Sequence, residues 1–323
     1  MTNVNENIFF ICSHDKDGGI YTFKLCPDGS LVKLFFTPCD RPSYIIISGD
    51  MLYATLREPL PMMSGVVKFK INSDFSLTQI GDIEYTFGGV AAHICVHRNS
   101  VYCANYLGGT TIKLPNKIVA HTGKGVNPVR QPSSHPHQVV ASPDGEYIIV
   151  NDLGTDKVRI FDLDLENEVS FAKVPDGFGP RHGIFSENGK YYYCVGEMGS
   201  NLNIFSYSDG KMSYIRTVSV IPEDFTGETT ASAIRMFNGR IYVSNRGHDS
   251  VCVLEGNGED ISVKGYIDVC GQSPREINFV GDFLVCGNEN TDDITIFKMK
   301  DDGSAEYIGK EHIIKPWGIT EAL

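Results

Sequence analysis

The stretch of sequence that decides the fold is residues 135–162, HPHQVVASPDGEYIIVNDLGTDKVRIFD. It predicts three short strands, at 137–142, 146–152 and 158–161, separated by turns at Pro143-Asp144-Gly145 and Gly154-Thr155-Asp156. Proline fixes φ, aspartate hydrogen-bonds its own backbone and glycine accepts positive φ, so these residues favour tight turns. The third strand alternates apolar and charged residues, as a half-buried strand does.

The chain repeats this arrangement from end to end. The copies of the third strand read YTFK, VKFK, IKLP, RIFD, NIFS, CVLE and TIFK, and their large apolar residues are Phe23, Phe69, Leu114, Phe161, Phe205, Leu254 and Phe297. Successive copies lie 43 to 49 residues apart. Four short strands in a repeat of this length are typical of a β-propeller blade. We therefore predict an all-β fold, a seven-bladed β-propeller with four antiparallel strands per blade.

The two ends of the chain complete one blade. The N-terminal part begins with the second strand of a repeat, at 8–12, and continues through strands at 21–25 and 30–36. The missing first strand is found at residues 315–320, KPWGIT, after the last complete repeat. Pairing of these segments closes the ring and removes exposed sheet edges. Since no linker interrupts the repeat, residues 1–323 are expected to form a single domain.

Charge and composition argue against several classes of protein. The formal net charge is −12, and there is no basic stripe of the kind that binds nucleic acid. No apolar segment reaches membrane-spanning length, and the N-terminal MTNVNENIFF lacks the regions of a signal peptide. The nine cysteines include no CxxC, and several lie within apolar strands, which indicates core residues in a reducing compartment. We expect a cytoplasmic protein, monomeric or weakly dimeric.

In each expected blade, the first two strands form a hairpin, so the start of the first strand lies beside the end of the second. Polar residues at these positions should therefore gather on one face of the propeller, around the central channel. Residues that open first strands are Arg41, His93, His135, His137, Arg181, His182, Arg275 and Trp317. Residues that close second strands are His14, Arg57, Asn105, Tyr106, Asn151, Asp152, Glu197, Asn245, Arg246 and Asn288. Arginines and histidines gathered at one channel mouth favour an anionic ligand, held through bidentate guanidinium contacts.

Several of these residues also have a structural interpretation. We expect one of His135 and His137 to brace the backbone and the other to face the channel. Arg159 and Arg235 are assigned to structural ion pairs, and Arg246 could pair with Asp249. Glu197, a carboxylate at a crowded channel mouth, is either an ion-pair partner that holds the fold together or a catalytic base.

Motifs for other chemistries are missing. The sequence contains no Gly-x-Ser-x-Gly and no His-Glu-x-x-His, so neither an α/β-hydrolase nucleophile nor a zinc protease site is supported. Oxygen ligands for calcium could come from Asp152, Glu197, Asn245 and Asn288, but neighbouring arginines disfavour a cation. We therefore expect no metal and no cofactor.

The chain resembles the seven-bladed propeller lactonase family, which includes bacterial 6-phosphogluconolactonase and fungal 3-carboxy-cis,cis-muconate cyclase. The resemblance is carried by residues 135–161 and by GPRHGIFSENGKYYYCVGE, IYVSNRGHDSVCV and QSPREINFVGDFLVCGNEN. It implies that His137, Arg181, Glu197 and Arg246 occupy the family's active-site positions, with Arg275 beside them. The sequence departs from the family pattern at Ala233-Ile234-Arg235, where the family often has an acidic residue ahead of Ile-Arg.

The leading hypothesis is a hydrolase that opens a small anionic sugar lactone, most notably 6-phosphogluconolactone. Glu197 or His137 would activate water, and Arg181 and Arg246 would hold the developing oxyanion. The residues expected to contact substrate are Arg275, His182, His93, Asn105, Asp152 and Asn245. Three alternatives stay open: a lactonising carboxymuconate cyclase, calcium-assisted hydrolysis, and a non-catalytic propeller that binds protein partners through its rim.

Overall fold

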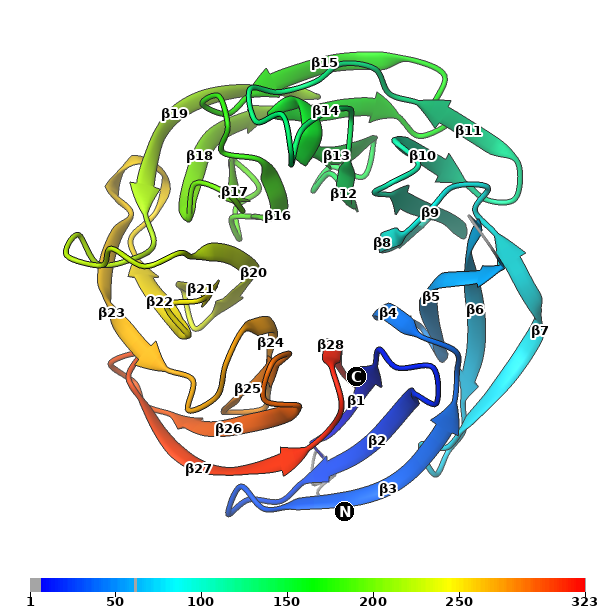
Figure 1. The fold of residues 1–323 in the computed structure, drawn as a ribbon, viewed down its shortest axis with the longest axis vertical. Helices are drawn as coiled ribbons and strands as arrows, with labels where there is room; N and C mark the ends of the chain where they lie inside the picture. Colours follow the sequence, from blue (N-terminus) through cyan, green and yellow to red (C-terminus); the bar gives the residue numbers. More distant parts are fainter. Residues whose placement is uncertain (1–6, 61–62, 323) are drawn as a thin grey trace.

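The structure, a computed structural model, describes residues 7–60 and 63–322 of the 323-residue chain. Within these residues, seven four-stranded antiparallel sheets surround a central channel (Figure 1). This is the seven-bladed β-propeller that the repeat predicts. Residues 1–6, on which the signal-peptide expectation partly depends, lie outside the described residues.

The blades follow the chain in order around the ring. From the channel outward, the first four sheets are β28 (Pro316–Glu321), β1 (Ile8–Ser13), β2 (Gly19–Leu25) and β3 (Leu31–Pro38); β4 (Pro42–Ser48), β5 (Met51–Leu60), β6 (Met63–Ile71) and β7 (Leu77–Tyr85); β8 (Ala91–His97), β9 (Ser100–Asn105), β10 (Thr110–Lys113) and β11 (Lys117–Ala120); and β12 (Pro136–Ala141), β13 (Tyr147–Asp152), β14 (Lys157–Asp162) and β15 (Glu168–Lys173). The other three are β16 (Pro180–Phe185), β17 (Tyr191–Gly196), β18 (Asn201–Ser208) and β19 (Lys211–Ser219); β20 (Thr230–Phe237), β21 (Arg240–Arg246), β22 (Ser250–Glu255) and β23 (Ser262–Asp268); and β24 (Pro274–Val280), β25 (Phe283–Asn288), β26 (Asp293–Met299) and β27 (Ala305–His312). Two 3₁₀ turns, η1 (Leu153–Thr155) and η2 (Gly258–Asp260), follow β13 and β22.

The first blade joins the two ends of the chain, as expected from the incomplete terminal repeats. Strand β28 pairs antiparallel with β1, with Ile319 opposite Ile11 and Glu321 opposite Phe9. In Figure 1 the red C-terminal strand lies directly beside the blue N-terminal one. The ring is therefore closed by hydrogen bonds between the two ends of the chain.

The core lies between neighbouring sheets. In one interface, Val195 and Ile204 from the β16–β19 sheet pack against Val243 and Leu254 from the β20–β23 sheet, all with at most 2% exposure. Large aromatic side chains, among them Phe205, fill the corresponding interfaces around the ring. Burial of each such side chain contributes roughly 1.5–3 kcal/mol. Packing from blade to blade thus fixes the inner strands rigidly around the channel.

Every innermost strand begins with a β-bulge against its neighbour. In β12, Pro136 pairs with Asp152 and Gln138 with Asn151, which leaves His137 as the extra residue. Equivalent register shifts open β4, β8, β16, β20, β24 and β28. Because a bulge bends its strand and re-aims the extra side chain, these shifts set the direction of side chains at the channel mouth.

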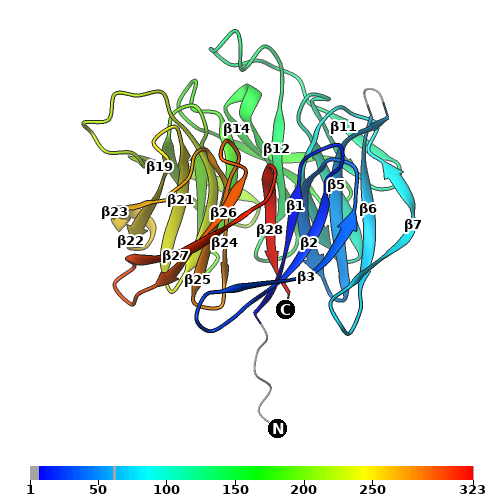
Figure 2. The same cartoon turned by 60° about the horizontal axis from the view of Figure 1, so that its bottom comes forward.

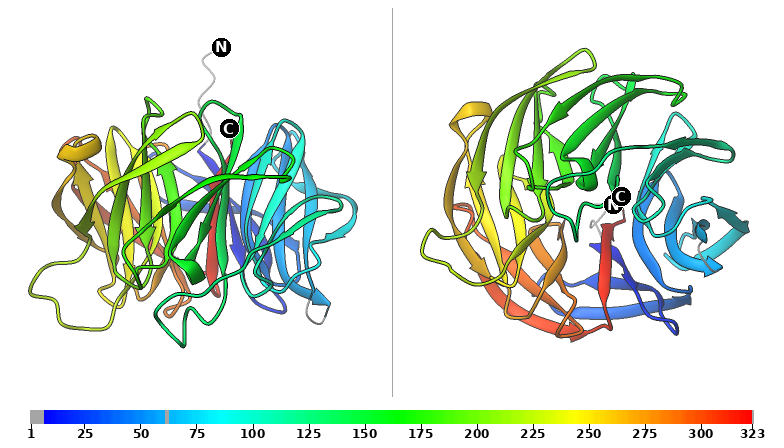
Figure 3. Two further views of the ribbon diagram at one scale, coloured as in Figure 1. Left: turned by 90° about the horizontal axis from the view of Figure 1, so that it is seen from above. Right: turned by 45° about the horizontal axis from the view of Figure 1, so that its top comes forward.

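The two longest connections between blades extend from the face where the inner strands begin. They are residues 121–135 between β11 and β12 and residues 220–229 between β19 and β20. Figures 2 and 3 show both projecting on the side of the disc opposite the C-terminal end of β28. This face therefore combines the bulged strand starts with the two long loops.

Candidate active site

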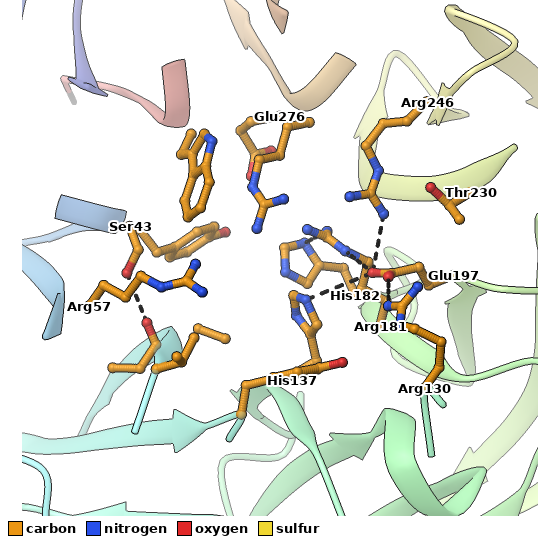
Figure 4. A pocket seen from close by; sticks show the side chains of 17 residues that line it. Ser43, Arg57, Arg130, His137, Arg181, His182, Glu197, Thr230, Arg246 and Glu276 are labelled. Carbon is orange, nitrogen blue, oxygen red and sulfur yellow. Dashed lines mark hydrogen bonds and ion pairs between the residues drawn. The ribbon is translucent and has the colours of Figure 1, made fainter. Parts of the chain in front are cut away.

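A cavity of about 260 Å³ lies at the mouth of the channel on the face of the long loops. Its walls come from the bulged starts of the inner strands and from the ends of the strands paired with them (Figure 4). The bulges supply Ser43, His137, Arg181, Arg275 and Trp317 to its lining. The volume is close to the lower bound for small-ligand pockets, about 300 Å³. It suits a small metabolite.

Glu197, which directly follows β17, is surrounded by cations. Its Oε2 accepts from Arg181 Nε at 2.8 Å and lies 3.2 Å from Arg246 Nη2, while Oε1 accepts from Arg130 Nη2. Burial opposes ionisation of this carboxyl, but Arg246, Arg181, His137 and Arg130 outweigh it and hold the pKa of Glu197 well below its usual range. Glu197 is therefore an ionised partner of three guanidiniums, and Figure 4 shows Arg130, Arg181 and Arg246 around it.

Arg181 and Arg246 are fixed by further contacts. Arg181 is 3% exposed and donates from Nη1 to the Ser232 carbonyl at 2.9 Å. Burial and then repulsion from Arg246 lower its pKa, while Glu197 acts in the opposite direction, and the guanidinium stays charged. The Nε of Arg246 is buried and has no hydrogen-bond partner among the described residues. That N–H is a free donor beside the cavity.

Three histidines form a row along the channel. The ring of His182 lies edge-to-face with those of His137 and His93, at centroid distances of 5.2 and 5.3 Å. Burial, followed by nearby arginines, lowers the pKa of all three, to about 3 for His93, so they are neutral. His137 Nε2 lies 3.9 Å from Glu197 Oε2, and its buried Nδ1 has no hydrogen-bond partner in the described part of the chain. A neutral imidazole beside an ionised carboxylate can accept a proton.

The opposite wall is built around Trp317. Its indole stacks on His14 with ring centroids 3.6 Å apart, and the Arg275 guanidinium lies 3.9 Å from the same indole centroid. Arg57 approaches this ring at 5.7 Å. Arg275 also contacts Glu289 at 3.3 Å. Cation–π contacts of this kind fix the direction of a guanidinium.

A buried ion pair completes the lining. Glu276 Oε1 accepts from Arg235 Nη2 at 2.7 Å and from the Ile277 amide at 3.1 Å. Burial raises the pKa of Glu276, and Arg235 partly offsets the rise. The structural assignment of Arg235 is confirmed. The carboxylate comes from β24, the inner strand of the blade that follows the one with Ala233 and Arg235.

The expected division of labour between His135 and His137 is confirmed. His135 Nδ1 lies 2.9 Å from the Tyr106 carbonyl and its ring stacks on Tyr106, whereas His137 lines the cavity. Arg246 contacts Glu197, and Asp249 instead accepts from the Gly247 and Ser273 amides.

Four residues expected to contact substrate lie outside the lining. Asn105 and Asn245 are fully buried and donate to the carbonyls of Thr86 and Val220, and Asp152 accepts from Arg159, Ser134, Thr155 and the His135 amide. His93 packs against Tyr44, with ring centroids 4.2 Å apart. Side chains at these strand ends point between the sheets, where they brace the blade-to-blade connections. Arg159 also pairs with Glu168, the structural role expected for it.

The cavity also contains residues that the sequence pattern does not single out. They are Ser43, Tyr44, Val90, Ala91, Ala92, Arg130, Thr230 and Glu276. Arg130 has a detectable signal, because the 15 residues of its connection exceed the usual length between elements, and long loops are often functional. Gln131 anchors this connection, donating to the Leu153 carbonyl and to Asp156 Oδ1 at 2.8 Å each.

The oxygens considered for calcium do not converge. Asp152 and Asn288 are bonded inside their own blades, Asn245 donates to the Val220 carbonyl in the connection before its blade, and Glu197 faces arginines. In the described part of the chain, no group of three or more His, Cys, Asp and Glu residues could hold a metal ion. Among the same residues, no helix is long and apolar enough to cross a membrane.

Fold and cavity together define a closed propeller with one arginine-rich polar pocket at its channel mouth. The family model described as Lactonase, 7-bladed beta-propeller matches residues 9–315, and the chain therefore belongs to this lactonase family.

Similar proteins come from several bacteria. An uncharacterised protein of Staphylococcus aureus strain USA300 is 29% identical over 316 residues, covering 90% of this chain and 92% of its own. A solved protein from Lactobacillus plantarum superposes with a TM-score of 0.90 at 26% identity, covering 98% and 100%. The periplasmic gluconolactonase of Pseudomonas aeruginosa gives 0.89 at 23%, covering 98% and 99%. A candidate 6-phosphogluconolactonase from Bacteroides fragilis gives 0.89 at 24%, covering 100% and 99%.

Proposed function

We propose that this protein is a lactone hydrolase whose substrate is an anionic sugar lactone, 6-phosphogluconolactone, which it opens to 6-phosphogluconate. The observation that carries the proposal is the charge of the cavity. Five arginines line it, Arg57, Arg130, Arg181, Arg246 and Arg275, against the two carboxylates Glu197 and Glu276. A cavity with excess guanidinium charge in a protein of net charge −12 concentrates small anions. Membership of the lactonase family points to lactones among them.

His137 is the proposed general base. Glu197 is a poor proton acceptor, since three guanidiniums stabilise its ionised form. His137 lines the cavity as a neutral imidazole with Nε2 3.9 Å from Glu197 Oε2, so it can take a proton from a water bound there. Glu197 then stabilises the imidazolium, as the carboxylate of a catalytic triad does. A separation of 3.9 Å is of the kind that shortens when substrate binds.

The reaction proceeds in two steps. Water attacks the lactone carbonyl carbon as His137 removes its proton, and the carbonyl oxygen becomes an oxyanion that accepts from the guanidiniums of Arg246 and Arg181. The bond between the carbonyl carbon and the ring oxygen then breaks, and the proton on His137 passes to the ring oxygen, which leaves as a hydroxyl. The new carboxylic acid loses its proton to solvent. Base and oxyanion donor each contribute about 10²- to 10³-fold or more.

The test is the rate of 6-phosphogluconate formation by purified protein, compared with spontaneous opening in the same buffer. We expect clear acceleration, which His137→Asn reduces by about 10²-fold or more. His312→Asn, on the exposed outer strand β27, is the matched control and retains full activity. Wild-type protein that gives no acceleration would overturn the proposal.

Three further measurements on the purified protein separate the alternatives. Activity on carboxymuconate with none on sugar lactones would identify a lactonising cyclase. Loss of activity on addition of a chelator would identify calcium-assisted hydrolysis. A protein inactive on every lactone, whose partner binding survives Arg181→Ala but not changes in the rim loops, would be a binding propeller.

A further inference from the structure

One cation of the cavity, Arg57, has no anionic partner among the described side chains. Arg130, Arg181 and Arg246 share Glu197, and Arg275 contacts Glu289. Among the side chains that the structure describes (7–57 and 63–322), Arg57 contacts no carboxylate, and its guanidinium lies 5.7 Å from the centroid of the Trp317 indole. A half-buried guanidinium normally has an anionic partner, because an unpaired charge away from water is costly. An anion supplied by the ligand would satisfy it.

Arg57 belongs to a wall that is built to hold guanidiniums in place. His14 and Arg275 lie 3.6 and 3.9 Å from the Trp317 indole centroid and so cover its two faces. Burial, followed by Arg57, lowers the pKa of His14 to about 4, so His14 adds no charge. The indole N–H of Trp317 is buried and has no acceptor among the described residues. The wall thus carries two oriented guanidiniums and one unused N–H donor.

This wall faces the reacting side of the cavity. Figure 4 places Arg57 across the cavity from Glu197 and Arg181. The two groups come from distant blades, β4–β7 for Arg57 and β16–β19 for Glu197. A ligand that fills the cavity therefore presents one end to each group.

We propose that Arg57, together with Arg275 on Trp317, forms a subsite for a phosphate group at the far end of the substrate, and that Arg57 determines the preference for phosphorylated over neutral lactones. A phosphate has enough acceptor oxygens to bind two guanidiniums at once. The lactone carbonyl then lies at His137, Arg181 and Arg246. This inference rests on the proposed function for its substrate, but the subsite can also be tested without catalysis.

The kinetic test compares Arg57→Met with wild type on 6-phosphogluconolactone and on unphosphorylated gluconolactone. Loss of a charged hydrogen bond predicts a KM for the phosphorylated lactone about 10- to 100-fold higher, with kcat within about twofold. Rates on the neutral lactone stay within about twofold, and Arg57→Lys recovers part of the loss. Arg98→Met, which removes an exposed arginine paired with Glu146, is the matched control and changes neither substrate's rate.

The binding test uses inorganic phosphate and calorimetry. Wild type binds phosphate, Arg57→Met binds it at least fivefold more weakly, and His137→Asn binds it as wild type does. Equal losses on both lactones, or unchanged phosphate binding by a folded Arg57→Met protein, would overturn the inference. If no lactone is hydrolysed while phosphate binding still depends on Arg57, the proposed function fails and the subsite stands.

Discussion

At the scale of single residues, Glu197 keeps the arginine cluster together. It contacts three guanidiniums, and Arg181 is almost fully buried. Glu197→Gln leaves these cations facing one another without an anion, so we expect a loss of about 3–5 kcal/mol in the free energy of unfolding. Urea denaturation measures this loss.

The matched control is Glu146→Gln, which breaks the exposed pair with Arg98. Such pairs contribute about 0–1 kcal/mol. Phosphate should recover stability in Glu197→Gln, since an anion bound between the guanidiniums stabilises the folded state alone. Equal stability of the two variants would show that the cluster does not need its carboxylate.

The buried histidines predict how stability depends on pH. In the folded state the pKa is about 3 for His93 and about 4 for His14, below the usual 6.5 of the unfolded chain. As pH falls below 6.5 the unfolded state binds protons first, so the contribution of these groups is complete above pH 6.5 and is lost progressively down to about pH 4 for His14 and about pH 3 for His93. Each group adds at most about 1.4 kcal/mol per pH unit.

The measurement is the free energy of unfolding between pH 7 and pH 4. His93→Gln should reduce the slope by up to about 1.4 kcal/mol per pH unit, whatever its effect on absolute stability. His312→Gln, on the outer strand, is the control. A slope that is the same in all three proteins would contradict the account of His93 as a buried neutral group.

At the scale of elements, the sequence predicts where the inner strands lie, but it does not predict the β-bulges at their starts. The turns and apolar periods locate the strands, and proline opens β4, β12, β16, β24 and β28. Which side chain turns to the channel depends on one extra residue, and a shift of one residue reverses the face. For that reason His137 and Arg275 are found at the cavity as expected, while Asp152 and Asn245 point between the sheets.

Gly154, in the turn after β13, contacts the 121–135 connection closely, and its substitution tests how this connection is positioned. A Cβ on Gly154 would lie 1.9 Å from the Ser133 carbonyl oxygen and 2.7 Å from the His135 amide nitrogen. Backbone atoms cannot yield as a flexible side chain does, so Gly154→Ala displaces the segment that leads into His137. We expect a loss of about 1–3 kcal/mol and a clear fall in kcat/KM, although Gly154 does not line the cavity.

Gly265→Ala in β23 is the matched substitution, because its Cβ would meet no atom within 4 Å. It should be neutral within about 0.5 kcal/mol, with unchanged activity. Thermal unfolding and steady-state kinetics on both variants provide the comparison. If Gly154→Ala behaves like Gly265→Ala, the contact with residues 133–135 does not position the site.

At the scale of the whole molecule, the closed ring brings together charges that lie far apart in the chain. Arg57 and Arg275 are 218 positions apart and both reach Trp317. The sequence predicts this closure because its first repeat lacks an inner strand that the C-terminus supplies. It does not predict Arg130 as a partner of Glu197, since a loop outside the repeat has no period from which to place it.

The last prediction concerns closure of the ring by the pairing of β28 with β1. Deletion of residues 315–323 removes β28, exposes the edge of β1 and takes Trp317 and Ile319 out of the core, where burial contributes roughly 1.5–3 kcal/mol for each large side chain. We expect the truncated protein to lose cooperative unfolding and to associate through the open edge of β1.

A circular permutant is the matched control. The Ala322 amide donates to the Ile8 carbonyl at 2.8 Å, so a short glycine-rich linker can join the two ends. A circular permutant joined there and opened at the turn 301–303 keeps every strand of the described residues and should retain its cooperative transition and its cavity. Denaturant unfolding measures the transition midpoint of both proteins, and sedimentation measures their oligomeric state. A truncated protein that stays monomeric with an unchanged midpoint would show that stability does not depend on β28.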